Sequence, residues 1–305
     1  MSRADIDMVR GGPPAGSSAA PDASWWFTAM PRNRVAVLRT IAYLFIPIDL
    51  FWLSAWSSLH GRLDGDLYQP LRIGRLLPFP TPDQALVAVT RWGLVLAIVL
   101  ALAGRFPRVT GWAIAVLYLQ WSLIGMSYGK VDHDRLGFHI LLFVLPTIGA
   151  VKWRDRTLDP RAGWIIRMAQ VAAVATYFLA AIAKVRFGGW EWVNSATMLR
   201  AVLRRGTDFG DWFGEHPETL HVFQYLMLIG EFASPILLIE TRWRRYFVYF
   251  AYLFHLGTYA ALTIAFFPHL VTMLAFLKLE RFAELVERRL PAGPAPVAEA
   301  ATSSG

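Results

Sequence analysis

Eight stretches of mostly apolar residues, separated by polar segments, constrain this chain more than any other feature of its sequence. A transmembrane helix needs roughly 20 predominantly apolar residues, and most of the eight stretches approach that length. We therefore predict an all-α, polytopic membrane helical bundle with about eight transmembrane helices. The predicted spans cover residues 35–57, 85–103, 111–127, 136–151, 164–183, 222–240, 246–263 and 267–280, of which the fourth and the eighth are short.

The composition excludes an ordinary soluble protein. Hydrophobic residues make up 55% of the 305 residues and charged residues only 17%, whereas soluble domains carry about 25% charged residues. The formal charge of +8 comes from residues that flank apolar runs, so it indicates membrane flanks and no nucleic acid partner. The chain contains no cysteine, which excludes disulfides, thiolate nucleophiles and iron–sulfur clusters.

The distribution of Lys and Arg predicts the orientation in the membrane. With the N-terminus inside, 17 of the 30 Lys and Arg residues fall on the inner side and 10 on the outer side. Because cytoplasmic loops carry an excess of basic residues, we expect a multi-pass protein of the plasma membrane with both termini in the cytoplasm. No cleaved signal peptide is expected. Residues 1–30 and 286–305 are predicted to be disordered tails, which leaves residues 31–285 as the transmembrane bundle.

Two of the predicted outer loops are long. The second of them, residues 184–221, contains Trp190, Trp192 and Trp212 among basic and acidic residues. This mixture is typical of an interfacial amphipathic helix or of a lid over a cavity.

Ionisable residues inside apolar spans are costly and usually face the bundle interior. Arg39 and Asp49 lie in the first span and Glu231 in the sixth. Ten residues of helix separate Arg39 from Asp49 by about 15 Å, so each needs a partner from another helix. We interpret these three residues as structural intramembrane charges. The other residues of this kind are His139, Arg167, Lys184 and His255.

Lys184 ends the fifth span where that helix should reach the outer surface, and Tyr177 lies two turns earlier on the same face. A lysine in this place can be an anchor that extends its ammonium to the interface. Alternatively, desolvation beneath the loop that holds Trp190 would supply a neutral amine able to accept a proton. The residues alone leave both interpretations open.

His133 lies in the polar segment between the third and fourth spans, next to Asp132 and on the same predicted side as Lys184. It is either an unremarkable loop histidine or a group that shuttles a proton or donates to a developing anion. His139 follows six residues later, on a different helical face, and no other histidine has metal-ligand spacing. We therefore predict no metal site.

The segment from Tyr177 to Lys184, Tyr-Phe-Leu-Ala-Ala-Ile-Ala-Lys, followed by Trp190, resembles a known family. It is similar to the segment around the active-site lysine of vitamin K-dependent gamma-carboxylase and of the wider HTTM (horizontally transferred transmembrane) family. The resemblance covers roughly residues 35–280. It continues through Leu38-Arg39 with Asp49, Arg75-Leu76-Leu77-Pro78, Asp132-His133, Glu231, Glu240 and His255.

The resemblance implies an enzyme in which Lys184 is the base toward a reduced lipid quinone of the vitamin K type and His133 stabilises the resulting anion. Tyr177, Trp190, His255 and Asp132 are then expected to line the substrate cavity. Only 25 residues follow Glu280, so we expect no counterpart of the β-rich lumenal domain with which the carboxylases hold their protein substrate. We therefore do not expect the gamma-carboxylation of glutamate. We do expect the membrane core to keep its chemistry on the reduced quinone.

Two other functions stay open at this level. The chain also resembles family members that assist the maturation of a sporulation-delaying peptide toxin, which predicts a non-enzymatic accessory protein whose partner is a small peptide. A transporter is the third alternative, but no internal symmetry or matched pair of broken helices supports it. Pro47, Pro146 and Pro235 predict kinked helices in each of the three cases.

Overall fold

The computed structural model describes residues 24–77 and 79–289. Within these residues the fold is helical, apart from a two-residue antiparallel pairing of β1 (Met30–Pro31) with β2 (Leu158–Asp159). The predicted all-α class is therefore confirmed.

The bundle is formed by eight helices, four of which continue into short turns of a different helical type. They are α1 (Arg32–Ile48) with the π-helical turn η2 (Asp49–Leu53), α3 (Gln84–Leu102), α4 (Pro107–Met126), α5 (Arg135–Val144) with η5 (Leu145–Ile148), α6 (Pro160–Gly188), α10 (Pro217–Ala233) with η6 (Ser234–Leu238), α11 (Arg244–Leu262), and α12 (Phe267–Met273) with η7 (Leu274–Phe276). Shorter elements connect or flank them: η1 (Trp25–Phe27), η3 (Ala55–Arg62), η4 (Gly65–Leu67), α2 (Arg72–Leu76), α7 (Glu191–Asn194), α8 (Thr197–Arg205), α9 (Asp208–Gly214) and α13 (Leu279–Arg289).

Within residues 24–77 and 79–289, five helical segments are long and apolar enough to cross a membrane, and two further apolar helices, Arg135–Ile148 and Phe267–Phe276, are shorter. This is compatible with an integral membrane protein. The count of eight spans stays a prediction, because α11 and the two shorter helices are not among the five. The five segments are Arg32–Leu53, Gln84–Leu102, Pro107–Met126, Pro160–Gly188 and Pro217–Leu238.

Local sequence signals explain where several helices begin and change type. The side chain of Asp83 caps α3 by accepting a hydrogen bond from the backbone N–H of Leu86 at 2.7 Å, and Pro160 occupies the first position of α6. Both are favoured helix starts. Pro47, Pro146 and Pro235 each lie where an α-helix passes into a π or 3-10 turn, since proline cannot donate the hydrogen bond that would continue the helix.

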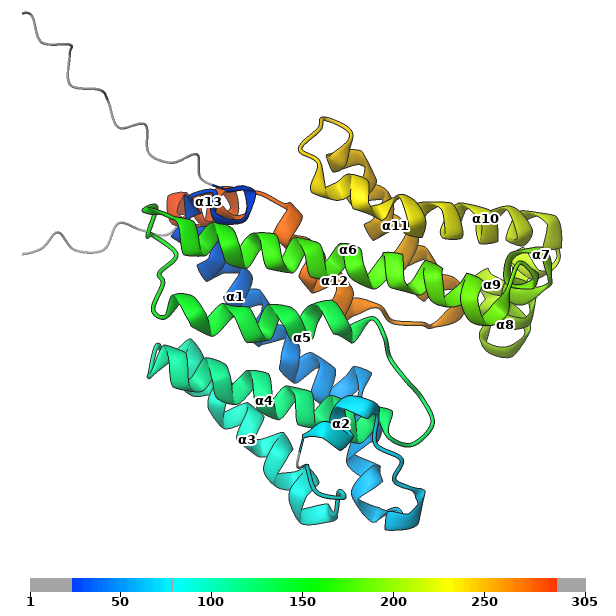
Figure 1. The fold of residues 1–305 in the computed structure, drawn as a ribbon, viewed down its shortest axis with the longest axis horizontal. Helices are drawn as coiled ribbons and strands as arrows, with labels where there is room; N and C mark the ends of the chain where they lie inside the picture. The colour runs from blue at the N-terminus through cyan, green and yellow to red at the C-terminus, as the bar shows by residue number, and fades with distance from the viewer. Residues whose placement is uncertain (1–23, 78, 290–305) are drawn as a thin grey trace, which may run out of the picture.

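Helix α6 runs along the length of the molecule and separates two halves of the bundle (Figure 1). Helices α1, α3, α4 and α5 lie on one side, α10 and α11 on the other, and α7, α8 and α9 gather at the C-terminal end of α6. The predicted loop over residues 184–221 is thus mostly helical.

The two halves differ in how tightly they pack. One large core joins α1, α3, α4, α5 and the N-terminal part of α6, with fully buried Trp121, Tyr118 and Phe138 at its centre. The other half has only small buried clusters, and α10 and α11 expose many large apolar side chains, among them Ile229 and Leu253. Cavities therefore form beside α10 and α11, where the packing leaves room for them.

The helices and strands extend beyond both ends of the predicted bundle of residues 31–285. Residues 25–27 form η1, Met30 pairs with Asp159, and α13 continues to Arg289. The remainder of the two predicted tails, residues 1–23 and 290–305, lies outside the described residues, so their predicted disorder stays a prediction.

Candidate active site

A cavity of about 230 Å³ lies where α6, α10, α11 and α12 meet the segment before α5, and α7 and α8 lie over it. We call it the polar cavity, because most of its wall is apolar but a group of ionisable side chains lines it. These residues are His133, Asp134, Tyr177, Lys184, Glu231, His255 and His269. A mostly apolar cavity with a few converging polar groups is the usual form of a small-molecule site.

The strongest contact in the polar cavity joins Lys184 of α6 to Glu231 of α10. The Nζ atom of Lys184 contacts both carboxylate oxygens of Glu231 and lies 2.6 Å from Oε2. The same ammonium lies 5.1 Å from the centroid of the Trp192 ring. Both partners stabilise the charged form of the amine. A proton acceptor at this place is therefore the Lys184–Glu231 pair rather than an isolated neutral lysine.

Tyr177 and His255 form the second polar contact. The hydroxyl of Tyr177 and Nε2 of His255 are 2.6 Å apart, and the two rings are stacked with centroids 5.6 Å apart. His269 packs edge-on against Tyr177 at 4.4 Å. Tyr177 and Lys184 are two helical turns apart, so both face the polar cavity from one side of α6.

The segment before α5 supplies the remaining ionisable groups of the polar cavity. Burial, and after it the positive charge of Lys184, lowers the pKa of His133, so its imidazole is neutral near pH 7 and one ring nitrogen can donate a hydrogen bond. Burial raises the pKa of Asp134 to about 7. The polar cavity therefore holds a neutral donor and a carboxyl group that titrates near physiological pH.

The structure brings together four of the six residues that were predicted to be catalytic or to line the cavity: Lys184, His133, Tyr177 and His255. It does not bring in the other two. Trp190 is 66% exposed, and Trp192 takes the place against Lys184. Asp132 instead contacts Lys130, with Oδ1 2.9 Å from Nζ.

The three predicted structural charges have different surroundings. Asp49 is completely buried and accepts two hydrogen bonds from Arg135, at 2.6 and 2.8 Å. Arg39 has no carboxylate partner among the described residues and donates to the backbone carbonyls of Gly149 and Val151. Glu231 belongs to the polar cavity. As the ten-residue spacing requires, Arg39 and Asp49 do not pair with each other.

Sequence reasoning did not assign three residues to the cavity wall: His269, Asp134 and Trp192, of which Trp192 was expected only as part of the loop over Lys184. A signal for His269 was available, because position 269 lies inside the predicted span 267–280, where an ionisable side chain is itself a reason to expect a site. Asp134 lies next to His133 in a polar segment, and nothing local shows that it is buried. Trp192 differs from Trp190 by two residues, which on a helix point in nearly opposite directions.

An apolar chamber of about 400 Å³ adjoins the polar cavity. The two spaces share Met198, Phe254, Thr258 and Leu262 as lining residues. The rest of the chamber is lined largely by aromatic and aliphatic side chains, including Phe209, Phe213, Leu220, Phe223, Phe250 and Leu253.

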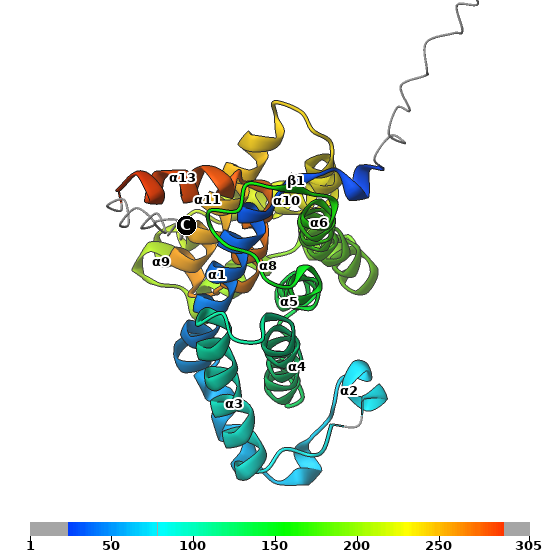
Figure 2. The same ribbon diagram turned by 90° about the vertical axis from the view of Figure 1, so that its left-hand side faces the viewer.

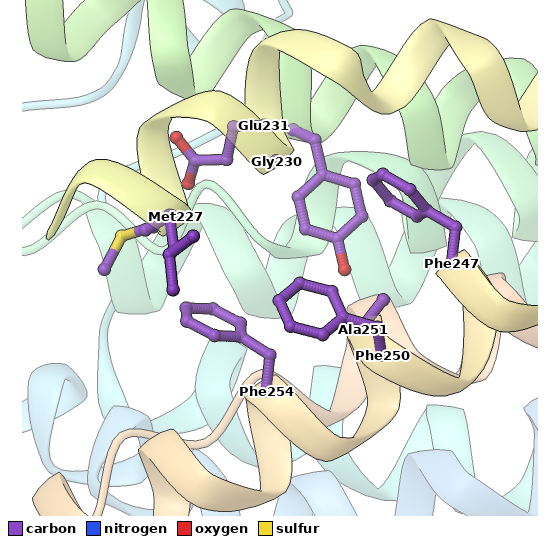
Figure 3. Close-up of a pocket in the computed structure, with 9 residues that line it drawn as sticks. Met227, Gly230, Glu231, Phe247, Phe250, Ala251 and Phe254 are labelled. Carbon is purple, nitrogen blue, oxygen red and sulfur yellow. The ribbon is translucent and has the colours of Figure 1, made fainter. Parts of the chain in front are cut away.

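A narrow cleft between α10 and α11, the lateral cleft, leads toward the same polar groups from the outer face of the two helices. Figure 3 shows Glu231 of α10 and Phe247, Phe250 and Phe254 of α11 in this space. A Cβ built on Gly230, which lines the cleft, would meet no atom within 4 Å. Glu231 therefore borders both the polar cavity and the lateral cleft.

Within the described residues, no group of three or more His, Asp or Glu side chains could hold a metal ion. Comparisons with protein-family models, with curated proteins and with solved structures find no match to this chain. Fold and site together define a class, an all-helical protein compatible with a membrane location, with a partly buried Lys–Glu pair in a largely apolar cavity.

Proposed function

We propose that this protein is a membrane enzyme of the HTTM type that acts on a reduced lipid quinone in the polar cavity. The observation that carries the proposal is the junction of two unlike spaces. A ring with phenolic hydroxyls fits the ionisable groups around Lys184, and an isoprenoid tail fits the adjoining apolar chamber. The lateral cleft between α10 and α11 has room for only about 20 Å³, so a lipid that enters here must first part these two helices.

In the proposed reaction the pair of Lys184 and Glu231 carries out the proton transfer, which their contact supports. Lys184 gives one of its protons to the carboxylate of Glu231 and takes the phenolic proton in its place. Glu231 ends neutral, Lys184 remains an ammonium, and the negative charge lies on the phenolic oxygen. His133 and the ammonium of Lys184 stabilise this charge by donating hydrogen bonds to it. The reduced quinone, once deprotonated, supplies the electrons for reaction with oxygen.

The contact between Tyr177 and His255 fixes the part of the cavity wall that lies beside the pair. The Tyr177 hydroxyl is fixed at 2.6 Å from Nε2 of His255, which leaves the ring of Tyr177 as a rigid apolar surface beside Lys184. We assign Tyr177 and His255 to substrate positioning.

The test is oxygen uptake by the purified protein in detergent, supplied with reduced menaquinone or phylloquinone. We expect uptake by the wild type and a loss of at least about 100-fold in Lys184→Ala, Glu231→Gln and His133→Ala, the scale of general acid–base catalysis. Lys130→Ala is the matched control, since Lys130 is 56% exposed and outside the polar cavity. Full uptake by Lys184→Ala would contradict the mechanism. A folded wild type inactive with every quinone would favour the peptide-maturation role.

We also propose that the chain crosses the plasma membrane eight times, with both termini in the cytoplasm. The excess of Lys and Arg on the inner side supports this orientation, and α11, Arg135–Ile148 and Phe267–Phe276 would complete the eight spans. Reporter fusions test it. Green fluorescent protein fused after residue 305 should fluoresce, whereas alkaline phosphatase fused at residue 65 should be active only if that loop is outside.

A further inference from the structure

We propose that a second cavity, at the opposite end of α6 from the polar cavity, binds the phosphate of an anionic lipid head group. This arginine cavity has a volume of about 310 Å³. It lies between the first turn of α1, the third turn of α6, the start of α11 with the loop before it, and the segment between η7 and α13. Arg167 in its wall precedes Lys184 by 17 residues, or about 25 Å of helix. The inference is independent of the proposed enzymatic activity.

The arginine cavity has a clear excess of positive charge. Five cationic side chains line it, against one carboxylate in its wall, that of Glu240, and a second, Glu280, close behind. The cations are Arg34, Arg167, Arg244, Arg245 and Lys278.

Glu240 cannot satisfy these cations by itself. It accepts a hydrogen bond from Nη2 of Arg167 at 2.6 Å and lies 3.7 Å from Nη1 of Arg244. The Nε atoms of Arg167 and Arg244 are buried and have no hydrogen-bond partner among the described residues. Arg167 itself is only 3% exposed. Arg167 also donates to the side chain of Gln170 at 3.2 Å, but its charge and that of Arg244 share the single carboxylate of Glu240. Buried cations without sufficient counter-charge are costly, so an anion in the cavity would balance the excess of positive charge.

A phosphate group fits these donors. Each guanidinium presents a planar fork of N–H groups that matches two phosphate oxygens. Arg244 of α11 and Lys278, between η7 and α13, line the cavity from different elements, so they can bind one phosphate from two directions.

The surroundings indicate that this phosphate belongs to a lipid. Trp243, Tyr246 and Tyr249 are exposed beside the cavity, and exposed aromatic residues of this kind mark the membrane interface. Amphipathic α13 lies across the end of the bundle rather than along it (Figure 2), as an interfacial helix does. Val248, Tyr249 and Phe276 add apolar walls against which an acyl chain can pack.

The experiment is a titration of the full-length protein in neutral detergent with dioleoyl-phosphatidylglycerol, followed by native mass spectrometry. Parallel titrations use dioleoyl-phosphatidylcholine, whose head group carries no net charge, and inorganic phosphate. The test variant is Arg244→Gln with Lys278→Gln. The matched control is Arg242→Gln, since Arg242 lies in the same loop but does not line the cavity. Arg245→Gln, at an exposed position, replaces the double variant if the latter unfolds.

We expect one saturable site for phosphatidylglycerol on the wild type and weaker binding of phosphatidylcholine. Each removed charge should weaken the binding roughly 5-fold, so the double variant should lose about 25-fold. Arg242→Gln should stay within about 2-fold of the wild type. Equal binding of the two lipids, or an equal loss in Arg242→Gln, would overturn the proposal. Saturable phosphate binding without preference for the lipid would assign the cavity to free phosphate instead and overturn the lipid assignment.

Discussion

Lys184 and Glu231 join the two loosely packed helices α6 and α10 through one ion pair, with Nζ 2.6 Å from Oε2. Their side chains are 18% and 12% exposed, so each charge is largely removed from water and depends on the other. In the proposed reaction the same pair accepts the proton. The pair therefore contributes both to the stability of this half of the bundle and to its chemistry.

Removing one member of this pair should destabilise the protein more than removing both. Lys184→Met and Glu231→Met should each lower the free energy of unfolding by about 1 to 3 kcal/mol, because a buried charge then loses its partner. The variant with both substitutions should recover most of that loss. Thermal unfolding in detergent measures the three values, and additive losses would show that the two charges do not depend on each other.

The pair of Asp49 and Arg135 should matter more for stability, since Asp49 is completely buried and the contact is bidentate. Asp49→Asn should cost about 3 to 5 kcal/mol, because it leaves Arg135 buried without its counter-charge. Tyr118→Phe, which removes the hydroxyl that donates to Asp49 at 3.0 Å, should cost about 1 kcal/mol. If both variants melted at the same temperature, the ion pair would not contribute more to the stability of the protein than the Tyr118 hydrogen bond does.

Asp134 predicts a pH dependence of stability. Burial raises its pKa to about 7 from the ordinary value of 3.8, so between these values the folded protein binds a proton that the unfolded chain does not. The free energy of unfolding should therefore fall as the pH rises from about 4 to 7, by at most about 1.4 kcal/mol per pH unit. Thermal melts over this range should show a flatter profile for Asp134→Asn than for the wild type, whereas Asp66→Asn, at an exposed position, should leave the profile unchanged.

The close contact between Gly163 of α6 and the backbone of Thr28 holds the residues before α1 against α6. A Cβ at this position would lie 1.8 Å from the backbone oxygen of Thr28, so Gly163→Ala must push the N-terminal segment away from α6. We expect a loss of about 1 to 3 kcal/mol and faster protease cleavage near residue 28. Gly257→Ala is the matched control, because its Cβ meets no atom within 4 Å and should gain up to about 1 kcal/mol in helix propensity. Equal cleavage rates in the two variants would contradict this account.

The sequence was enough to predict the helical class and the membrane-compatible apolar segments, because both follow from the length of apolar runs. It also identified Lys184, His133, Tyr177 and His255, which the structure brings to one cavity. It could not show that Glu231 contacts Lys184, since the two residues are 47 positions apart and only the packing of α10 on α6 joins them. We predicted that Trp190 lines the cavity, whereas Trp192 lies against Lys184. The residue at which the four-residue helix α7 begins determines which of the two rings faces the cavity, and the sequence does not show it.

The 86 residues that separate Asp49 from Arg135 also set an order of events during synthesis. At ~5 to 20 residues per second, the first helix waits roughly 4 to 17 s before the arginine that will neutralise its carboxylate has been made. A carboxylate at the centre of a lone membrane helix costs about 3 kcal/mol to insert, and one near the helix end, as Asp49 is in Arg32–Leu53, costs less. Ser54, whose hydroxyl lies 3.1 Å from Oδ2 of Asp49, is a partner already made by then. The first helix therefore enters the bilayer with one hydrogen-bond donor to Asp49, the hydroxyl of Ser54, already in place.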